Sequence, residues 1–154
     1  MNKTELEFAL AECTADVLEQ MFFVQAREEA APATPEADSD LICKMNFTGD
    51  PSGCLALRVS LGAARTIAAD FLGEDEAGLS AFQVGQVVCE LANIICGSVL
   101  SRMESGTTFR LDSPHLLSVW EKSGGDATVH SVPLDTGVLT VVFATERPVC
   151  PRAA

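Results

Sequence analysis

The chain has 154 residues, 47% of them hydrophobic and 21% charged, a balance that predicts one folded domain over residues 1–154 and argues against a disordered chain. Its 22 acidic and 10 basic side chains give a net charge of −12, which opposes binding to nucleic acid and to anionic membrane surfaces. No apolar run is as long as a membrane span and no signal peptide is visible, so we expect a cytoplasmic protein.

The first predicted helix runs from Thr4 to about Gln25. Thr4 and Glu7 have the spacing of a capping box, in which a hydroxyl and a carboxylate satisfy the first free N–H groups of a helix. Apolar side chains then recur on one helical face, at Leu6, Leu10, Cys13, Val17, Met21 and Val24. Residues 26–40 consist mainly of alanine, proline and acidic or small polar residues, which predicts a flexible acidic loop.

A hairpin and a short helix are predicted next. Strand-like runs over 41–48 and 54–60 are joined by glycine, aspartate, proline and serine, a composition typical of a turn. Ser60 is a suitable N-cap for a helix over 61–72. Gly73 stands at the position where helices commonly end in a left-handed residue.

A long helix and four strands complete the predicted elements. Ser80 and Gln83 form a second capping box, so this helix begins at Ser80 and runs to about Glu104. Strands are predicted after it at 107–111, 116–122, 128–134 and 138–145, which would end the chain in a meander. This order indicates an α+β fold, with long helices packed on a mixed, largely antiparallel sheet. A capped helix followed by strands occurs in each half of the chain, which is compatible with a diverged internal duplication.

The cysteines and histidines give no sign of a metal or cofactor site. They lack the CxxC pair and the short ligand spacings of a zinc site, at Cys13, Cys43, Cys54, Cys89, Cys96, Cys150, His115 and His130. Most of the cysteines have apolar neighbours, so we expect reduced, structural thiols. Cys43 and Cys54 are interpreted as a packing contact across the predicted hairpin.

The long helix carries the most informative pattern in the chain. At 100° per residue, about two thirds of its circumference is apolar, with Phe82 on a flank of this apolar zone, and a narrow polar strip remains. The members of this polar strip are Gln83, Gln86, Glu90, Asn93, Gly97, Ser101 and Glu104. The strip has no cation to pair with its carboxylates, and its glycine costs about 1 kcal/mol of helix stability relative to alanine. Two explanations stay open: a solvated strip whose glycine packs against a neighbouring element, or a partner surface that approaches the backbone.

Glu90 and Asn93 stand in the sequence Glu-Leu-Ala-Asn, with Gly97 four residues later. This spacing resembles the E-x-x-N signature of the CheC/CheX family of chemotaxis phosphatases. The resemblance covers most of the chain and follows the order of elements in that family, at Leu55-Ala56-Leu57, at Ile67 to Gly73, at the E-x-x-N helix and at Leu111-Asp112-Ser113-Pro114.

Two departures refine this resemblance. Members of the CheC type carry a second E-x-x-N in the first helix, whereas the corresponding stretch here, Glu12 to Ala15, has no amide at its last position. One site is therefore expected, and the chain is most similar to CheX. Many relatives also have asparagine directly after the glycine, at the position of Ser98 in this chain.

The resemblance implies a phosphatase that removes the phosphoryl group from an aspartate of a CheY-like receiver domain. Mg²⁺ would be held by the receiver, and the chain would need no cofactor or metal of its own. Asn93 would orient the attacking water through its amide, and Glu90 would dock against the active-site lysine of the receiver. Gln86, Gly97 and Ser101 would contact the receiver around them. Relatives of the CheX type pair through their sheets, so a homodimer is also expected.

Other functions are weighed against phosphatase activity. The middle domains of flagellar motor-switch proteins share the fold of the family without its motif, so a non-catalytic module that binds a receiver or motor protein is the main alternative. A purely structural or dimeric scaffold is the third function considered. Asp112, Ser113 and His115 are close in sequence but lack the G-x-S-x-G context of a hydrolase. The glycines at 124 and 125 lack the spacing and the lysine of a phosphate-binding loop. The sequence does not show which receiver or which two-component circuit is involved.

Overall fold

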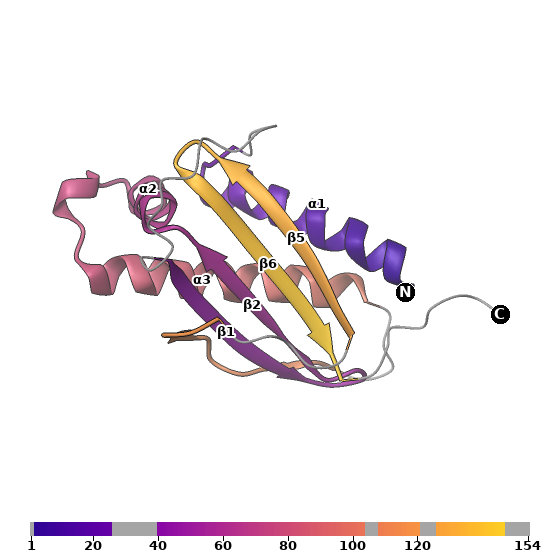
Figure 1. Ribbon diagram of the computed structural model, residues 1–154. Helices are drawn as coiled ribbons and strands as arrows, with labels where there is room; N and C mark the ends of the chain where they lie inside the picture. Colours follow the sequence, from indigo (N-terminus) through magenta and orange to yellow (C-terminus); the bar gives the residue numbers. More distant parts are fainter. Residues whose placement is uncertain (1, 26–39, 104–107, 121–125, 147–154) are drawn as a thin grey trace.

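In the computed structural model, the described part of the chain comprises residues 2–25, 40–103, 108–120 and 126–146. Its sheet has the strand order β3-β1-β2-β6-β5, and β4 also pairs with β1 (Figure 1). The strands are β1 (Leu41–Thr48), β2 (Gly53–Val59), β3 (Arg110–Leu111), β4 (His115–Leu117), β5 (Asp126–Leu134) and β6 (Gly137–Thr145). Every strand pair in the described residues is antiparallel. The predicted acidic loop falls outside the described residues, except for its last residue.

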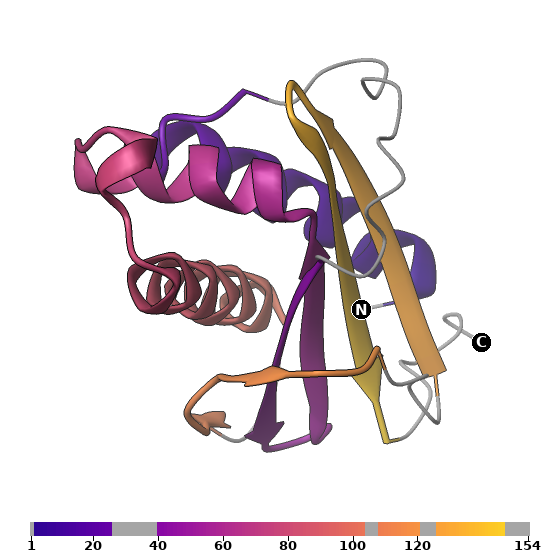
Figure 2. The same cartoon turned by 60° about the vertical axis from the view of Figure 1, so that its left-hand side comes forward.

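The three helices of the described residues lie against one face of this sheet, and Figure 2 shows α3 end on, below the other two. They are α1 (Lys3–Met21), α2 (Leu61–Leu72) and α3 (Ala81–Arg102), with a short 3₁₀ turn at Glu76–Gly78 between α2 and α3. Because α3 packs against α1, α2, β1 and β2, it is the central helix of the layer. The predicted α+β class is confirmed.

The start and the end of α1 differ from the prediction. The capping box is formed by Asn2 and Glu5, not by Thr4 and Glu7: Asn2 Oδ1 accepts from the Glu5 N–H at 2.8 Å, and Glu5 Oε2 accepts from the Asn2 N–H at 3.0 Å. The amide oxygen of asparagine caps a helix as effectively as a hydroxyl does, and Glu5 stands three residues after Asn2, at the spacing of a capping box. The helix ends at Met21 instead of Gln25 because Phe23 adopts a left-handed backbone with φ 59°.

The predicted caps of the other two helices are largely confirmed. Ser80 Oγ accepts from the Gln83 N–H at 3.1 Å, and Gln83 Oε1 accepts from the Ser80 N–H at 2.9 Å, so α3 begins with the expected capping box. Gly73 ends α2 in the left-handed conformation, with φ 68°. Ser60 occupies the N-cap of α2, but its hydroxyl donates to the carbonyl oxygen of Thr136 at 3.4 Å and makes no capping bond.

The strands after α3 do not form the predicted meander. Both β3 and β4 pair with β1, whereas the β5–β6 hairpin joins β2 on the other side of the sheet. β3 and β4 are also shorter than predicted, because they divide one edge of β1 between them: β3 pairs with Phe47 and Thr48, and β4 pairs with Ile42 to Lys44. Pro114, between them, has no N–H to donate to a strand ladder.

The predicted contact between Cys43 and Cys54 is wrong. The register of the hairpin places Cys43 opposite Leu57 and Cys54 opposite Asn46. The thiol of Cys43 instead lies 3.5 Å from the thiol of Cys89 on α3. Burial and this second thiol raise the pKa of Cys43, and burial raises the pKa of Cys96 to about 12, so both thiols stay protonated at neutral pH.

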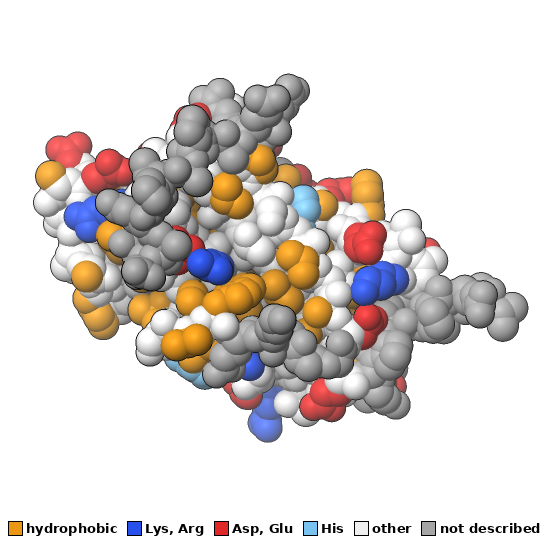
Figure 3. All heavy atoms as spheres, in the orientation of Figure 1, with side chains coloured by type: hydrophobic (Ala, Val, Ile, Leu, Met, Phe, Trp, Pro, Cys, Tyr) orange, Lys and Arg blue, Asp and Glu red, His pale blue; other side chains and the backbone are white. Residues whose placement is uncertain are grey.

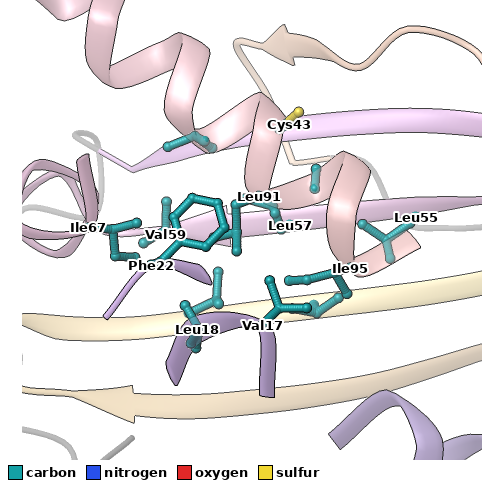
Figure 4. Packing of buried hydrophobic residues seen from close by; sticks show 14 of the residues in the cluster. Val17, Leu18, Phe22, Cys43, Leu55, Leu57, Val59, Ile67, Leu91 and Ile95 are labelled. Carbon is teal, nitrogen blue, oxygen red and sulfur yellow. The ribbon is translucent and has the colours of Figure 1, made fainter. Parts of the chain in front are cut away.

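The core lies between the sheet and the three helices. Figure 4 shows side chains of α1, α3 and β2 pointing toward one another, among them Val17, Leu18, Phe22, Leu55, Leu57, Val59, Leu91 and Ile95. Among the described helices, α3 alone is long and apolar enough to cross a membrane, with a mean hydropathy of 1.5, but 56% of that apolar window is buried in the protein. The prediction that no apolar run is as long as a membrane span was therefore too strong for α3. A helix in the core of a protein can have the same length and hydropathy as a membrane span.

Shortening a core side chain of α3 should destabilise the protein. Leu91 is fully buried, so we expect Leu91→Ala to lower the free energy of unfolding by about 3 kcal/mol through lost burial and the cavity it leaves. Leu72→Ala is the control, because Leu72 is exposed on α2 and its loss should cost under about 1 kcal/mol. Urea denaturation measures the free energy of unfolding of both variants. An equal loss of stability in the two would contradict the central place of α3 in the core.

Candidate functional site

A groove of about 600 Å³ runs between α3 and the segment that connects β3 to β4. In Figure 2 this segment, coloured orange, passes below α3. One wall consists of Phe82, Gly85, Gln86, Cys89, Glu90 and Asn93, and the other consists of Leu111, Asp112, Ser113, Pro114 and Leu116. The groove thus brings Glu90 and Asn93 together with a segment, 111–116, that lies beyond the end of α3 in the chain.

The polar side chains of the helical wall have no side-chain partners among the residues that the structure describes. Gln86 and Glu90 are exposed and Asn93 is half-buried. Within the described residues, none of the three side chains forms a hydrogen bond or an ion pair. No Lys or Arg is among the described residues that line the groove. A free acid and a free amide, one helical turn apart, are therefore available to a molecule that enters the groove.

The opposite side of α3 fixes this orientation. Val88, Leu91 and Ile95 are fully buried against the rest of the core. Because residues three and four apart share a helical face, rotating α3 to turn Glu90 inward would pull these side chains into water. The prediction that the polar strip faces outward is confirmed for its described members. Glu104 lies outside the described residues.

The second wall is held in place by β1. Leu111 and Leu116 pair with Phe47 and Cys43, and between these pairs the backbone N–H of Asp112 donates to the carbonyl oxygen of Asn46 at 2.9 Å. The wall also approaches α3 closely at Gly85, where an added Cβ would lie 2.8 Å from Leu116 Cδ1. Glycine at this position lets the two walls meet at the bottom of the groove.

Gly97 and Ser101 continue the polar strip but do not line the groove. A Cβ added at Gly97 would meet no atom within 4 Å, so the interpretation that this glycine packs against a neighbouring element is wrong for the described part of the chain. The hydroxyl of Ser101 donates to the carbonyl oxygen of Ser98 at 2.8 Å and so is used within the helix. Of the predicted contact residues, only Gln86 lies in the groove with the acid–amide pair.

The corresponding stretch of α1 offers no second site. Glu12 Oε1 lies 2.9 Å from Arg102 Nη1, an ion pair between α1 and α3 that occupies the carboxylate. Ala15, at the position where an amide would be needed, is exposed. The expected single site therefore agrees with the geometry of both helices.

The alternative chemistries find no support in this geometry. His115 Nδ1 lies 3.1 Å from the backbone carbonyl oxygen of Ser113, so this ring nitrogen is occupied away from the serine hydroxyl. The described residues contain no group of three His, Cys, Asp or Glu side chains placed to hold a metal ion. Glycines 124 and 125 lie outside the described residues.

The sequence did not predict the second wall as part of the site, and it missed three residues of the first wall: Phe82, Gly85 and Cys89. Phe82 was counted with the apolar part of α3, yet its side chain is 73% exposed and lines the groove. The signal was present, because Phe82 stands four residues before Gln86 and so begins the row of the polar strip. Asp112 was noted for its place in the order of elements and for its nearness to Ser113 and His115. Its position opposite α3 was not predicted, because that position depends on pairing with β1.

The described part of the chain is an α+β protein whose three helices lie on one face of an antiparallel sheet. The central helix, α3, presents an acid and an amide outward. The family model of the chemotaxis phosphatase CheX matches residues 41–128, which include the whole groove. This match covers more than half of the chain, and the chain is a member of the CheX family. A comparison with curated proteins gave no match.

Solved structures agree with this assignment at the level of the fold. The chain is similar to chemotaxis protein CheX from Vibrio vulnificus, with 21% identity and a TM-score of 0.70 over 92% of this chain and 97% of that one. It is also similar to a chain in the CheX–CheY–BeF3–Mg complex from Borrelia burgdorferi, with 18% identity and a TM-score of 0.72 over 90% and 96% of the two chains. The FliM middle domain from H. pylori is more distant, with 9% identity and a TM-score of 0.53 over 94% of each chain.

Proposed function

We propose that this protein removes the phosphoryl group from the phosphorylated aspartate of a CheY-like receiver domain. The observation that carries the proposal is the pair Glu90 and Asn93, which lines a groove of a CheX family member and has no side-chain partner among the described residues. The structure from Borrelia burgdorferi, in which CheX is bound to CheY with BeF3 and Mg, supports a receiver as the class of partner.

The amide of Asn93 suits the chemistry of an acyl phosphate. Such a phosphate is already activated, so its hydrolysis needs mainly a water molecule in line with the breaking P–O bond and stabilisation of the charge on the phosphoryl oxygens. An amide donates and accepts hydrogen bonds, so it can orient this water without acting as a base. Asn93 is therefore the proposed catalytic residue.

Glu90 is proposed to dock and orient the receiver. A carboxylate pointed at phosphorus would repel the phosphoryl oxygens, whereas one that pairs with a lysine at the edge of the receiver site would anchor α3. Mg²⁺ belongs to the receiver in this proposal, because the two groove carboxylates, Glu90 and Asp112, come from different walls and no third ligand joins them in the described residues. The chain itself then needs no cofactor.

Phosphate release tests the proposal directly. The protein is mixed with CheY-type receivers from the same organism, each phosphorylated with a small-molecule phosphodonor, and the release of phosphate is compared with that of each receiver alone. We expect at least one receiver to lose its phosphoryl group faster. Binding to a receiver without any acceleration would favour the alternative, a non-catalytic module like the middle domain of FliM.

Alanine at Gly97 should separate stability from activity. The added methyl group meets no atom within 4 Å, so Gly97→Ala should raise the free energy of unfolding by up to about 1 kcal/mol through better helix propensity. The same methyl group would stand between α3 and the docked receiver, so we expect kcat/KM to fall about fivefold or more.

Gly62→Ala is the matched control for this substitution, because Gly62 is an exposed helical glycine on α2. Its kcat/KM should equal that of the unaltered protein. A Gly97→Ala variant with full activity would show that the receiver does not approach α3 at this position.

A homodimer formed through the sheets is part of the proposal. The face of the sheet opposite the helices carries apolar side chains over its middle, as Figure 3 shows, and Val129 of β5 is exposed there. We expect Val129→Lys to convert the dimer to a monomer, because the substitution places a charge in an apolar interface. Light scattering after gel filtration measures this, and a monomeric unaltered protein would contradict it. We place the protein in the cytoplasm with its proposed partner.

A further inference from the structure

Three large apolar side chains that line the groove are exposed to solvent. Phe82 of α3 is 73% exposed, and on the opposite wall Leu111 is 36% exposed and Leu116 is 46% exposed. We call these three residues the apolar wall. Apolar area left in water gives up the free energy that its burial would contribute, so a group of such side chains in one groove indicates a surface that a partner covers.

The register of the sheet shows that the two leucines face the helical layer. Leu111 lies opposite Phe47, and Leu116 lies opposite Cys43, and both partners are buried on the helix side of β1. Residues paired directly across two strands point to the same face of a sheet. These positions are therefore continuous with the core, but α3 does not reach far enough over them to cover them.

The charges of the groove indicate what covers the apolar wall. Glu90 and Asp112 face the groove from its two sides, and no cation is among the described residues that line it. With a net charge of −12, the chain repels nucleic acid and anionic lipid. The occupant that fits is a protein surface with an apolar patch beside a cationic group.

We propose that the apolar wall binds an apolar patch of the receiver next to its phosphorylated aspartate and thereby selects which receiver is dephosphorylated. This inference rests on the proposed function. Phe82 and Asn93 are 11 residues apart, which is about 16 Å along a helix. When Asn93 reaches the phosphoryl group, Phe82 is therefore too far away to touch the reacting atoms.

This distance predicts how the apolar wall acts. A contact remote from the reacting atoms is made equally in the ground state and in the transition state, so it strengthens binding without changing the chemical step. Phe82→Ser and Leu111→Ser should each raise KM, and the Kd for a receiver loaded with beryllofluoride, by about tenfold. The value of kcat should stay within about twofold.

The chain provides a matched control for the experiment. Phe8 is 68% exposed on α1, outside the groove, so Phe8→Ser removes the same side chain at nearly the same exposure. Its KM and Kd should equal those of the unaltered protein. Circular dichroism and urea denaturation of the three variants show that each is folded before binding is compared.

Each result decides the inference. If Phe82→Ser behaves like Phe8→Ser, or lowers kcat at unchanged KM, the apolar wall is not a binding surface. If the unaltered protein binds the loaded receiver but releases no phosphate, the proposed function fails, and the ratio of the Kd values still tests the apolar wall. If the unaltered protein binds no receiver from its organism, both proposals are overturned.

Discussion

Replacing Asn93 by alanine should lower kcat for phosphate release from the receiver by about 100-fold or more, the usual effect of removing a group that positions or stabilises the reacting atoms. The Kd for a beryllofluoride-loaded receiver should change by less than about threefold. Asn93 makes no hydrogen bond within the described residues, so we expect its replacement to leave the fold intact and, under the proposed mechanism, to affect the reaction. Measuring kcat and Kd on one preparation separates the two effects.

Two further variants test how the amide works. Asn93→Asp keeps the shape of the side chain but brings a negative charge toward the phosphoryl oxygens, so it should be no more active than Asn93→Ala. Gln20→Ala removes an exposed helical amide on α1, outside the groove, and should leave kcat unchanged. An Asn93→Asp variant with substantial activity would instead indicate general-base catalysis, and full activity in Asn93→Ala would remove Asn93 from the mechanism.

Reversing the charge of Glu90 should have the second large effect, this time on binding. In Glu90→Lys the partner's cation meets a like charge in a groove that contains no other described Lys or Arg. We therefore expect the Kd for the loaded receiver to rise about 100-fold or more, and Glu90→Gln to raise it about tenfold. Glu90 is exposed, so neither variant should unfold the protein.

The control for Glu90→Lys is Glu19→Lys. Glu19 is an exposed acid on α1, so this variant changes the net charge of the chain by the same amount, away from the groove. If both variants weaken binding equally, only the overall charge matters. A local role for Glu90 requires that the Kd of Glu19→Lys stay within about twofold of the Kd of the unaltered protein. It also requires that added salt reduce the difference in Kd between Glu90→Lys and Glu19→Lys.

The sequence predicted those features of the fold that depend on neighbouring residues. The capping box at Ser80 and the left-handed Gly73 are properties of a few consecutive side chains, and the structure contains both. The outward face of α3 follows from its 3.6-residue period, which placed Glu90 and Asn93 correctly. The start of α1 was misassigned because two capping boxes overlap there, and local rules do not rank Asn2 against Thr4.

The second wall of the groove could not be predicted in the same way. Leu111 and Asp112 face α3 only because β3 and β4 both return to the same edge of β1, which is a choice of strand pairing over more than 60 residues of chain. Phe82 was assigned to the flank of the apolar zone of α3, because helical periodicity alone does not say how far a neighbouring element extends. The site was therefore half predicted: its acid and amide came from the sequence, and its shape came from the tertiary structure.

The decisive experiment is a structure of this protein bound to a beryllofluoride-loaded CheY-type receiver. We expect α3 to enter the receiver site with the side-chain amide of Asn93 about 3 Å, or one bridging water, from the beryllofluoride, and with Glu90 paired with a receiver cation. A receiver docked on the open face of the sheet or on α1, with Asn93 still facing solvent, would contradict it.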